Sequence, residues 1–135
     1  MTPEDTHRLE AFLKPSHIVV VATLGRNGML HLTPNWYAYA NETLMISTTK
    51  ERVKYRNLTR DNRMTVCIYS EPRAQDYATL WGRVSIREDA SIWPDTRAIV
   101  ERYVPAQDVE ARLQQLRTQN RVILDLKPER VLFRA

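Results

Sequence analysis

The segment Ser47–Leu58 combines hydroxyl and basic side chains in a pattern suited to binding an anion. From Lys50 to Arg63 there are six Lys/Arg and two Asp/Glu, an excess of +4 that equals the formal charge of the whole 135-residue chain. If Thr48 or Thr49 caps a helix that begins near Lys50, the free N–H groups and the positive dipole end of that helix point toward the same place as the basic side chains. The segment therefore predicts a site for a phosphate or a polycarboxylate.

The expected helix has a polar and an apolar side. At 3.6 residues per turn, Lys50, Lys54 and Asn57 share one stripe, whereas Val53 and Leu58 are expected to face the body of the protein. Such a run of charge is also typical of a plain solvated helix face, and the sequence alone leaves that alternative open.

Two further positions are candidates for contact with a flat ligand. Pro34 lies in the strand-like run Thr33–Trp36 and cannot donate to a ladder, so it implies a bulge or an edge. A bulge would free backbone groups for a ligand, and the alternative is a plain edge strand with an incidental proline. Trp81 precedes Gly82 in the middle of another strand, where simple core packing is the alternative reading. Together with an anion site, these features describe a pocket that holds a phosphate at one end and a flat ring along the strands. A flavin-type cofactor has this shape.

Other kinds of site are not supported. His7, His17 and His31 lie at no ligand spacing to one another or to Cys67, and no CxxC, HExxH or G-x-S-x-G motif occurs. The chain has three glycines and no Gly-rich phosphate loop, which excludes a Rossmann site. We therefore expect no metal, and we identify no catalytic side chain.

Length and composition indicate a single domain over residues 1–135, large enough to hold a core without disulfides. No stretch approaches the ~20 apolar residues of a membrane span, and Met1–Asp5 lacks the pattern of a signal peptide, so we expect a cytoplasmic protein with no membrane partner. The pI near 9.5 raises a nucleic-acid role. However, the basic excess is confined to one segment in which Tyr55 is the only aromatic residue, so we expect no nucleic-acid partner.

Hydrophobic periodicity predicts a small antiparallel barrel of short strands, closed or partly open, decorated by helices. Besides the basic helix, helices are expected between Thr2 and Pro15, over 95–103 and over 109–119. Strands are expected over 18–24, 30–39, 44–47, 64–69, 77–87 and 121–126, with Pro128 interrupting the last before 131–133. The pair Asn27-Gly28 predicts a hairpin between the first two strands.

The motifs, in this order, resemble a known family. Residues 21–28, 33–39, 47–58, 82–84 and 127–131 are similar to the pyridoxamine 5′-phosphate oxidase-like split-barrel flavoproteins, and most similar to their branch of small deazaflavin-dependent reductases that use coenzyme F-420. The resemblance covers nearly the full length. It implies a mainly β fold: a six-stranded antiparallel split β-barrel (the FMN-binding split barrel, a Greek key) with a few short helices. It also implies a homodimer with two cofactors at the subunit interface.

The resemblance assigns cofactor contacts as well. Hydroxyl and N–H groups of Ser47–Thr49 would meet the cofactor phosphate, and the main chain of Pro34–Trp36 would lie against the tricyclic ring. Trp81 and Gly82, in one subunit or the other, would close the far side. The implied cofactor-binding residues are Thr33, Pro34, Asn35, Trp36, Ser47, Thr48, Thr49, Lys50, Arg52, Lys54, Asn57, Trp81 and Gly82.

From these observations we expect an oxidoreductase that binds coenzyme F-420 and transfers hydride to an activated C=C or C=N of a small conjugated substrate. One alternative is an FMN-binding oxidoreductase or flavin reductase of the same family. Another is a non-catalytic protein that only carries the cofactor. Arg56, Arg60 and Arg63 continue the positive charge beyond the phosphate cluster, which favours a cofactor with a polyglutamate tail over compact FMN.

Overall fold

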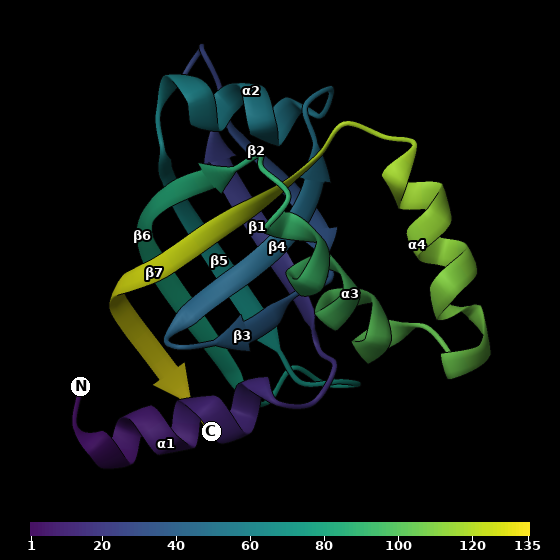
Figure 1. Ribbon diagram of the computed structural model, residues 1–135. Coiled ribbons are helices and arrows are strands. Elements are labelled where there is room, and N and C mark those ends of the chain that lie inside the picture. The colour runs from purple at the N-terminus through teal and green to yellow at the C-terminus, as the bar shows by residue number, and fades with distance from the viewer.

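The computed structural model describes all of residues 1–135 as one curled antiparallel sheet with helices around it (Figure 1). Its seven strands, in the sheet order β2-β1-β5-β6-β7-β4-β3, are β1 (Ile18–Leu24), β2 (Leu30–Asn35), β3 (Ala38–Ala40), β4 (Thr43–Thr49), β5 (Arg63–Tyr69), β6 (Tyr77–Arg87) and β7 (Arg121–Arg134). The helices are α1 (Pro3–Leu13), α2 (Val53–Arg60), α3 (Ile92–Tyr103) and α4 (Val109–Arg117), with a short 3-10 turn η1 (Ala106–Asp108) before α4.

The two outermost strands of the sheet, β2 and β3, are consecutive in the chain. Only Trp36 and Tyr37 separate them, so the sheet has to curl until its two edges approach each other. The sequence predicts one strand over 30–39, and the structure divides it at this corner, which raises the strand count from six to seven. The half-barrel architecture itself agrees with the predicted antiparallel barrel, in its partly open form.

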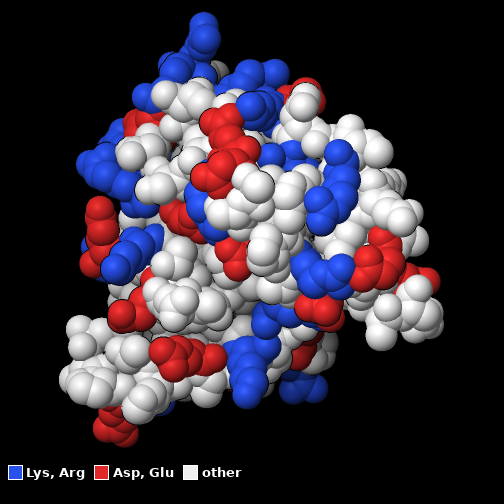
Figure 2. Space-filling model, viewed as in Figure 1, with Lys and Arg blue, Asp and Glu red and all other residues white.

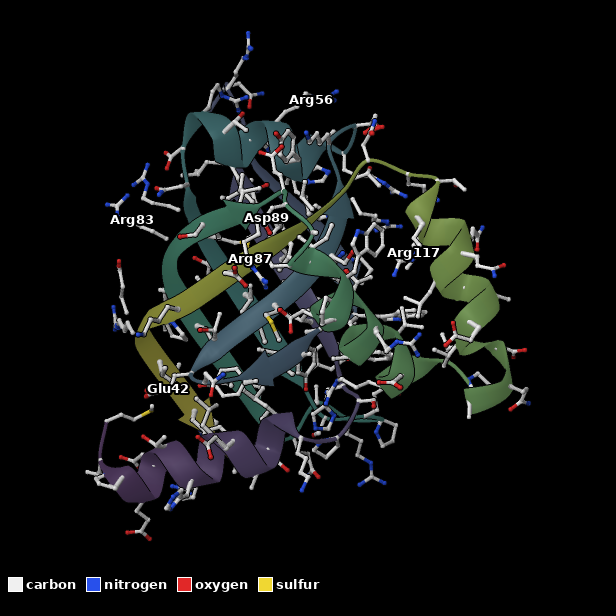
Figure 3. All side chains as sticks on the ribbon, in the orientation of Figure 1. Glu42, Arg56, Arg83, Arg87, Asp89 and Arg117 are labelled. Atoms are coloured by element: carbon white, nitrogen blue, oxygen red, sulfur yellow. The ribbon has the colours of Figure 1, made fainter.

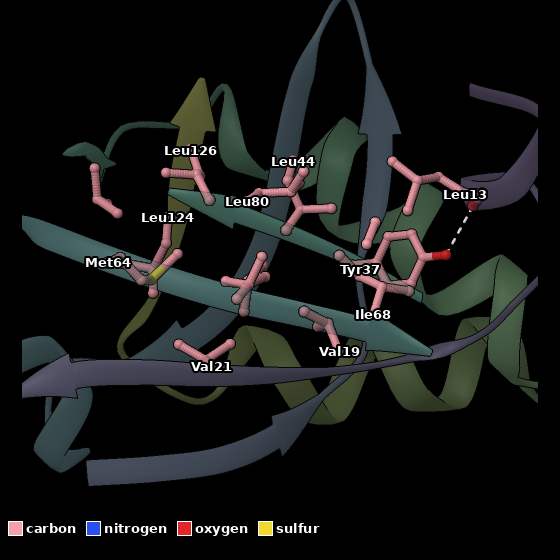
Figure 4. Close-up of a cluster of buried hydrophobic side chains, with 14 of the residues drawn as sticks. Leu13, Val19, Val21, Tyr37, Leu44, Met64, Ile68, Leu80, Leu124 and Leu126 are labelled. Carbon is pink, nitrogen blue, oxygen red and sulfur yellow. Dashed lines mark hydrogen bonds between the residues drawn. The ribbon is translucent and has the colours of Figure 1, made fainter. Parts of the chain in front are cut away.

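The inner face of the sheet forms one hydrophobic core, which Figure 4 shows from Val19 and Val21 on β1 to Leu124 and Leu126 on β7. Tyr37 from the corner is fully buried in it, and its hydroxyl donates to the carbonyl of Leu13 at 2.7 Å. Because a buried hydroxyl needs a partner, this bond fixes the corner against the C-terminal end of α1.

β7 is longer than predicted. Pro128 does not end the strand, because the pairing with β6 shifts by one residue between Trp81 and Gly82 and continues to Arg134. Gly82 is required at this bulge. A Cβ atom there would lie 2.9 Å from Leu126 Cδ1 and 2.9 Å from the carbonyl oxygen of Lys127.

Helices α3 and α4 form a hairpin beside the sheet (Figure 1). α3 packs on β3, β4 and β7. α4 is held mainly by a separate cluster in which Val100 of α3 meets Val109, Leu113 and Leu116. The pair therefore adds a wall that the barrel alone does not supply. None of the four helices has the length and apolar character needed to cross a membrane.

Candidate functional site

A groove of about 440 Å³ lies where the curled sheet splits, and it has the size of a small-molecule site. β3 is only three residues long and pairs with β4 no further than Met45, so the rest of β4 has no neighbour on that side. The groove runs between this free part of β4 and the last residues of β2. The unpaired backbone of β4 and β2 therefore faces this groove, at the one place where the barrel is not closed.

Eight of the thirteen predicted cofactor residues line this groove: Thr33, Pro34, Asn35, Trp36, Ser47, Thr48, Arg52 and Lys54. They come from three separate segments, which the fold brings together. On the β2 side, the Thr33 hydroxyl and the Asn35 amide are hydrogen-bonded at 2.9 Å. Pro34 stays in register opposite Val20 on an edge strand, so the edge rather than the bulge is the correct reading of this proline.

The other end of the groove is cationic and holds no acidic residue. Lys54, Arg52 and Arg121 line it, whereas Arg112 lines the groove beside Trp36, with its guanidinium 5.4 Å from the ring centroid. The Arg121 side chain runs along β4, where its Nη1 donates to Ser47 Oγ at 3.4 Å, and its Nε donates to the side chain of Gln119 at 2.9 Å. Three basic groups thus lie near two hydroxyls without a carboxylate, and the fourth, Arg112, lies beside Trp36.

Lys54 is the most unusual of these groups, because its side chain is almost entirely buried, at 4% exposure. Burial, together with the neighbouring Arg52 and Arg121, lowers the pKa of Lys54. Burial also lowers the pKa of Arg121, as do Arg52 and Arg112 beside it. Lys54 is buried among cations that are themselves partly or fully exposed. A buried cation with cationic neighbours is unfavourable in isolation, and an anion would relieve both the repulsion and the lost solvation.

Helix α2 begins later than predicted. It starts at Val53, with Arg52 as N-cap and no side-chain capping bond, whereas Thr48 and Thr49 belong to β4. The physical reason is strand pairing: Thr49 is opposite Arg121, and the Lys50 N–H donates to the Asn120 carbonyl at 3.1 Å, so this stretch stays extended. The N–H groups of the first turn of α2 remain without a cap and are available to a ligand.

Five predicted site residues lie outside the groove. Thr49 does not line it, and Lys50 points away to an ion pair with Glu88 at 2.6 Å. Asn57 is buried and donates to the Thr23 hydroxyl at 3.1 Å, which ties α2 to β1.

The last two of the five predicted residues outside the groove are Trp81 and Gly82. They line a different groove, on the outer face of the sheet. The prediction for Val53 was wrong as well, because this side chain is exposed rather than packed on the body, while Leu58 is buried as predicted.

The sequence also missed one wall of the groove. Thr96, Ile99 and Val100 of α3 and Leu116 of α4 supply a mostly apolar surface opposite the strands. Arg112 and Arg121 were missed too. Their only sequence signal was a basic residue next to an apolar run, which is common in any chain, and only the docking of α4 and the β4–β7 register bring them to the site.

A second cationic groove lies beside α2, lined by Arg26, His31, Arg56 and Arg60 among others, again without an acidic residue. Figure 2 shows Lys and Arg gathered over this end of the molecule, and Figure 3 shows Arg56 on α2. Arg60 is partly engaged, since it donates to Asn57 Oδ1 at 2.9 Å and to the Leu24 carbonyl at 3.2 Å.

No group of three or more His, Cys, Asp or Glu side chains lies close enough to hold a metal ion.

Comparisons with known proteins support one family. The family described as pyridoxamine 5′-phosphate oxidase matches residues 5–135 of the chain. Among solved structures, a conserved hypothetical protein of Mycobacterium tuberculosis is 21% identical with a TM-score of 0.81, covering 99% of this chain and 84% of that one. No curated protein matches the sequence significantly.

Two further solved structures are similar. An F420 reductase is 22% identical with a TM-score of 0.72, covering 91% of this chain and 94% of that one. A protein of Listeria innocua described as a putative pyridoxamine 5′-phosphate oxidase is 18% identical with a TM-score of 0.72, covering 94% and 95%. At these identities the likeness shows the fold, a split barrel, and not a shared activity.

Proposed function

Because the chain belongs to the pyridoxamine 5′-phosphate oxidase family, whose members bind flavin-type cofactors, we propose that it is an oxidoreductase that holds such a cofactor, the deazaflavin coenzyme F-420, in the cationic groove. It would transfer hydride to an activated C=C or C=N of a small conjugated substrate. One observation carries the proposal: Lys54 is buried next to Arg52 and Arg121 in a groove with no acidic residue.

The residues present fit the cofactor's two ends. Lys54 and Arg121, with the hydroxyls of Ser47 and Thr48, form the phosphate end, where charge-assisted hydrogen bonds are strongest. The ring end is the stretch Pro34–Trp36, facing the apolar side chains of α3 and α4. The cofactor would supply the hydride chemistry, and the chain's own residues would bind it, orient it and exclude water.

The positive charge beyond the groove favours the deazaflavin over FMN, because compact FMN ends at its phosphate whereas the deazaflavin carries a polyglutamate tail. The second cationic groove, with Arg26 and Arg56, is lined by other residues of α2 and would suit the carboxylates of a polyglutamate tail. The similarity to an F420 reductase points the same way. Arg63 does not contribute, because it pairs with Asp61 at 2.7 Å.

Fluorescence titration of the purified protein with each cofactor, at low and high salt, tests this choice. We expect the deazaflavin to bind at least about tenfold more tightly than FMN, since one additional charge-assisted contact is enough for that difference. Its affinity should fall as salt rises, because the tail contacts are exposed and screened.

Arg56→Ala should weaken binding of the deazaflavin and leave the affinity for FMN unchanged. Arg63→Ala is the matched control. Tighter FMN binding would instead support the FMN alternative. Tight binding without turnover of any acceptor would support the cofactor carrier.

We also propose that the chain forms a homodimer, with its cofactors at the subunit interface. Leu30 and Leu32 on β2 are exposed by 59% and 58%, and Leu132 on β7 is exposed by 47%. The strand register places Leu32 in a row with Ala22, Thr65 and Trp81, so an apolar band crosses the outer face of the sheet. A second copy of the chain packed on this band would bring its Trp81 and Gly82 toward the cofactor bound to the first copy. Sedimentation that gives a monomer at micromolar concentration would rule out a shared site.

A further inference from the structure

Another groove, of about 390 Å³, lies beyond Trp36, between the C-terminal end of α3 and the side of α4. Tyr103, Val104 and Pro105 contribute a flat, mostly apolar wall. Trp36 and Arg112 line both this groove and the cationic one, so the two spaces meet at these two side chains. A molecule bound here would lie next to the ring end of the proposed cofactor site.

Trp36, one of the two residues shared by the grooves, is held in place by its neighbours. Its indole stacks on the ring of Tyr103, with centroids 5.0 Å apart and planes inclined by 4°. Tyr103 is itself held, because its hydroxyl donates to the carbonyl of His17 and the guanidinium of Arg102 lies 5.7 Å from its ring centroid. The groove therefore has a fixed aromatic wall, and such a wall favours planar ligands.

Arg112, the other residue shared by the two grooves, is a cation without an acidic partner. Its guanidinium lies 5.4 Å from the ring centroid of Trp36. One acidic residue, Asp108, lines the same groove, but Arg112 forms no ion pair with it. By contrast, Arg97 on α3 is paired with Glu110 at 2.6 Å. A planar guanidinium offers two parallel donors that match a carboxylate, and its place on a flexible stem allows it to follow a ligand into the groove.

From this juxtaposition we infer that the groove is the binding site of the acceptor substrate, and that the substrate is a small planar conjugated carboxylate whose acid group pairs with Arg112. Its unsaturated end would lie past Trp36, against the ring end of the cationic groove. The phosphate of the cofactor does not compete for this position, because Lys54, Arg121 and two hydroxyls serve it at the other end. The assignment of a substrate, though not the binding itself, rests on the proposed function.

The binding test uses cinnamate and its neutral amide, which have the same carbon skeleton. NMR titration of the purified chain, without coenzyme, should show cinnamate binding about tenfold more tightly than the amide, the value of one charge-assisted pair. Arg112→Gln should remove this preference. Arg117→Gln should keep it, because Arg117 lies on the same helix but stacks on Trp93 at 4.5 Å and lines neither groove (Figure 3).

The results separate the possible roles of Arg112. A preference for cinnamate that survives Arg112→Gln, or the absence of any preference, overturns the inference. So does an Arg112→Gln protein that binds inorganic phosphate less tightly and still prefers cinnamate, because Arg112 would then belong to the cofactor's anion site.

Cinnamate and the coenzyme should also bind together, and mutual exclusion would overturn the substrate assignment. Failure of the proposed function would be seen separately, as a wild-type protein that binds neither coenzyme while its Arg112-dependent preference persists.

Discussion

Replacing Lys54 by Met separates ligand binding from folding more clearly than any other change in the groove. Methionine fills a similar volume without the charge, so the packing of α2 on the barrel is kept. The buried ammonium has Arg52 and Arg121 as charged neighbours and no carboxylate. We therefore expect Lys54→Met to be as stable as the wild type or more stable at pH 7, and to bind inorganic phosphate or the cofactor about ten- to a hundredfold less tightly. That loss corresponds to one charge-assisted contact of about 1.5–3 kcal/mol.

The pH dependence of stability gives an independent check. Burial lowers the folded-state pKa of Lys54 below its ordinary value of 10.5, so between the two values the unfolded chain holds one more proton than the folded chain. The free energy of unfolding should therefore rise with pH through this window, by about 1.4 kcal/mol for each unit of pKa depression. The rise should be absent in Lys54→Met. It should also shrink when phosphate is bound, because an anion stabilises the protonated form.

The measurements are urea unfolding between pH 7 and pH 10.5 and a phosphate titration of each variant. Lys50→Met is the matched control, because Lys50 is exposed, pairs with Glu88 and lies outside the groove. Phosphate affinity should be unchanged in that variant. If Lys54→Met binds phosphate like the wild type, or loses stability at pH 7, the buried charge is not an anion site and the reasoning fails.

Two further predictions concern predicted site residues that lie outside the groove. Asn57→Ala should lower the free energy of unfolding by about 1–3 kcal/mol, because it leaves the Thr23 hydroxyl unpaired, yet phosphate affinity should stay within about twofold; a stable variant that cannot bind phosphate would contradict this. Gly82→Ala should destabilise by about 1–3 kcal/mol because its Cβ would meet Leu126 and the Lys127 carbonyl at 2.9 Å, and thermal unfolding equal to that of the wild type would show that the bulge can relax.

Much of the fold was predictable from local patterns. The apolar alternation of residues 77–87 requires a strand with one buried face, and Asn27-Gly28 fits the hairpin that joins β1 to β2. The basic excess after Ser47 and the proline at position 34 marked two of the segments that form the groove. These features depend on periodicity, on turn chemistry and on charge close together in the chain, which a sequence displays directly.

What the sequence did not contain was which segments become neighbours. The pairing of β4 with β7 brings Arg121 to Ser47 and keeps the chain extended past Thr49, so α2 begins at Val53 and Lys50 is left outside the groove. The docking of α4 adds Arg112 to the site. Each outcome depends on residues about 60 or more positions apart, and local propensity cannot encode a register between them. The residue types therefore predicted an anion site, and the tertiary structure decided which cations line the groove proposed for it.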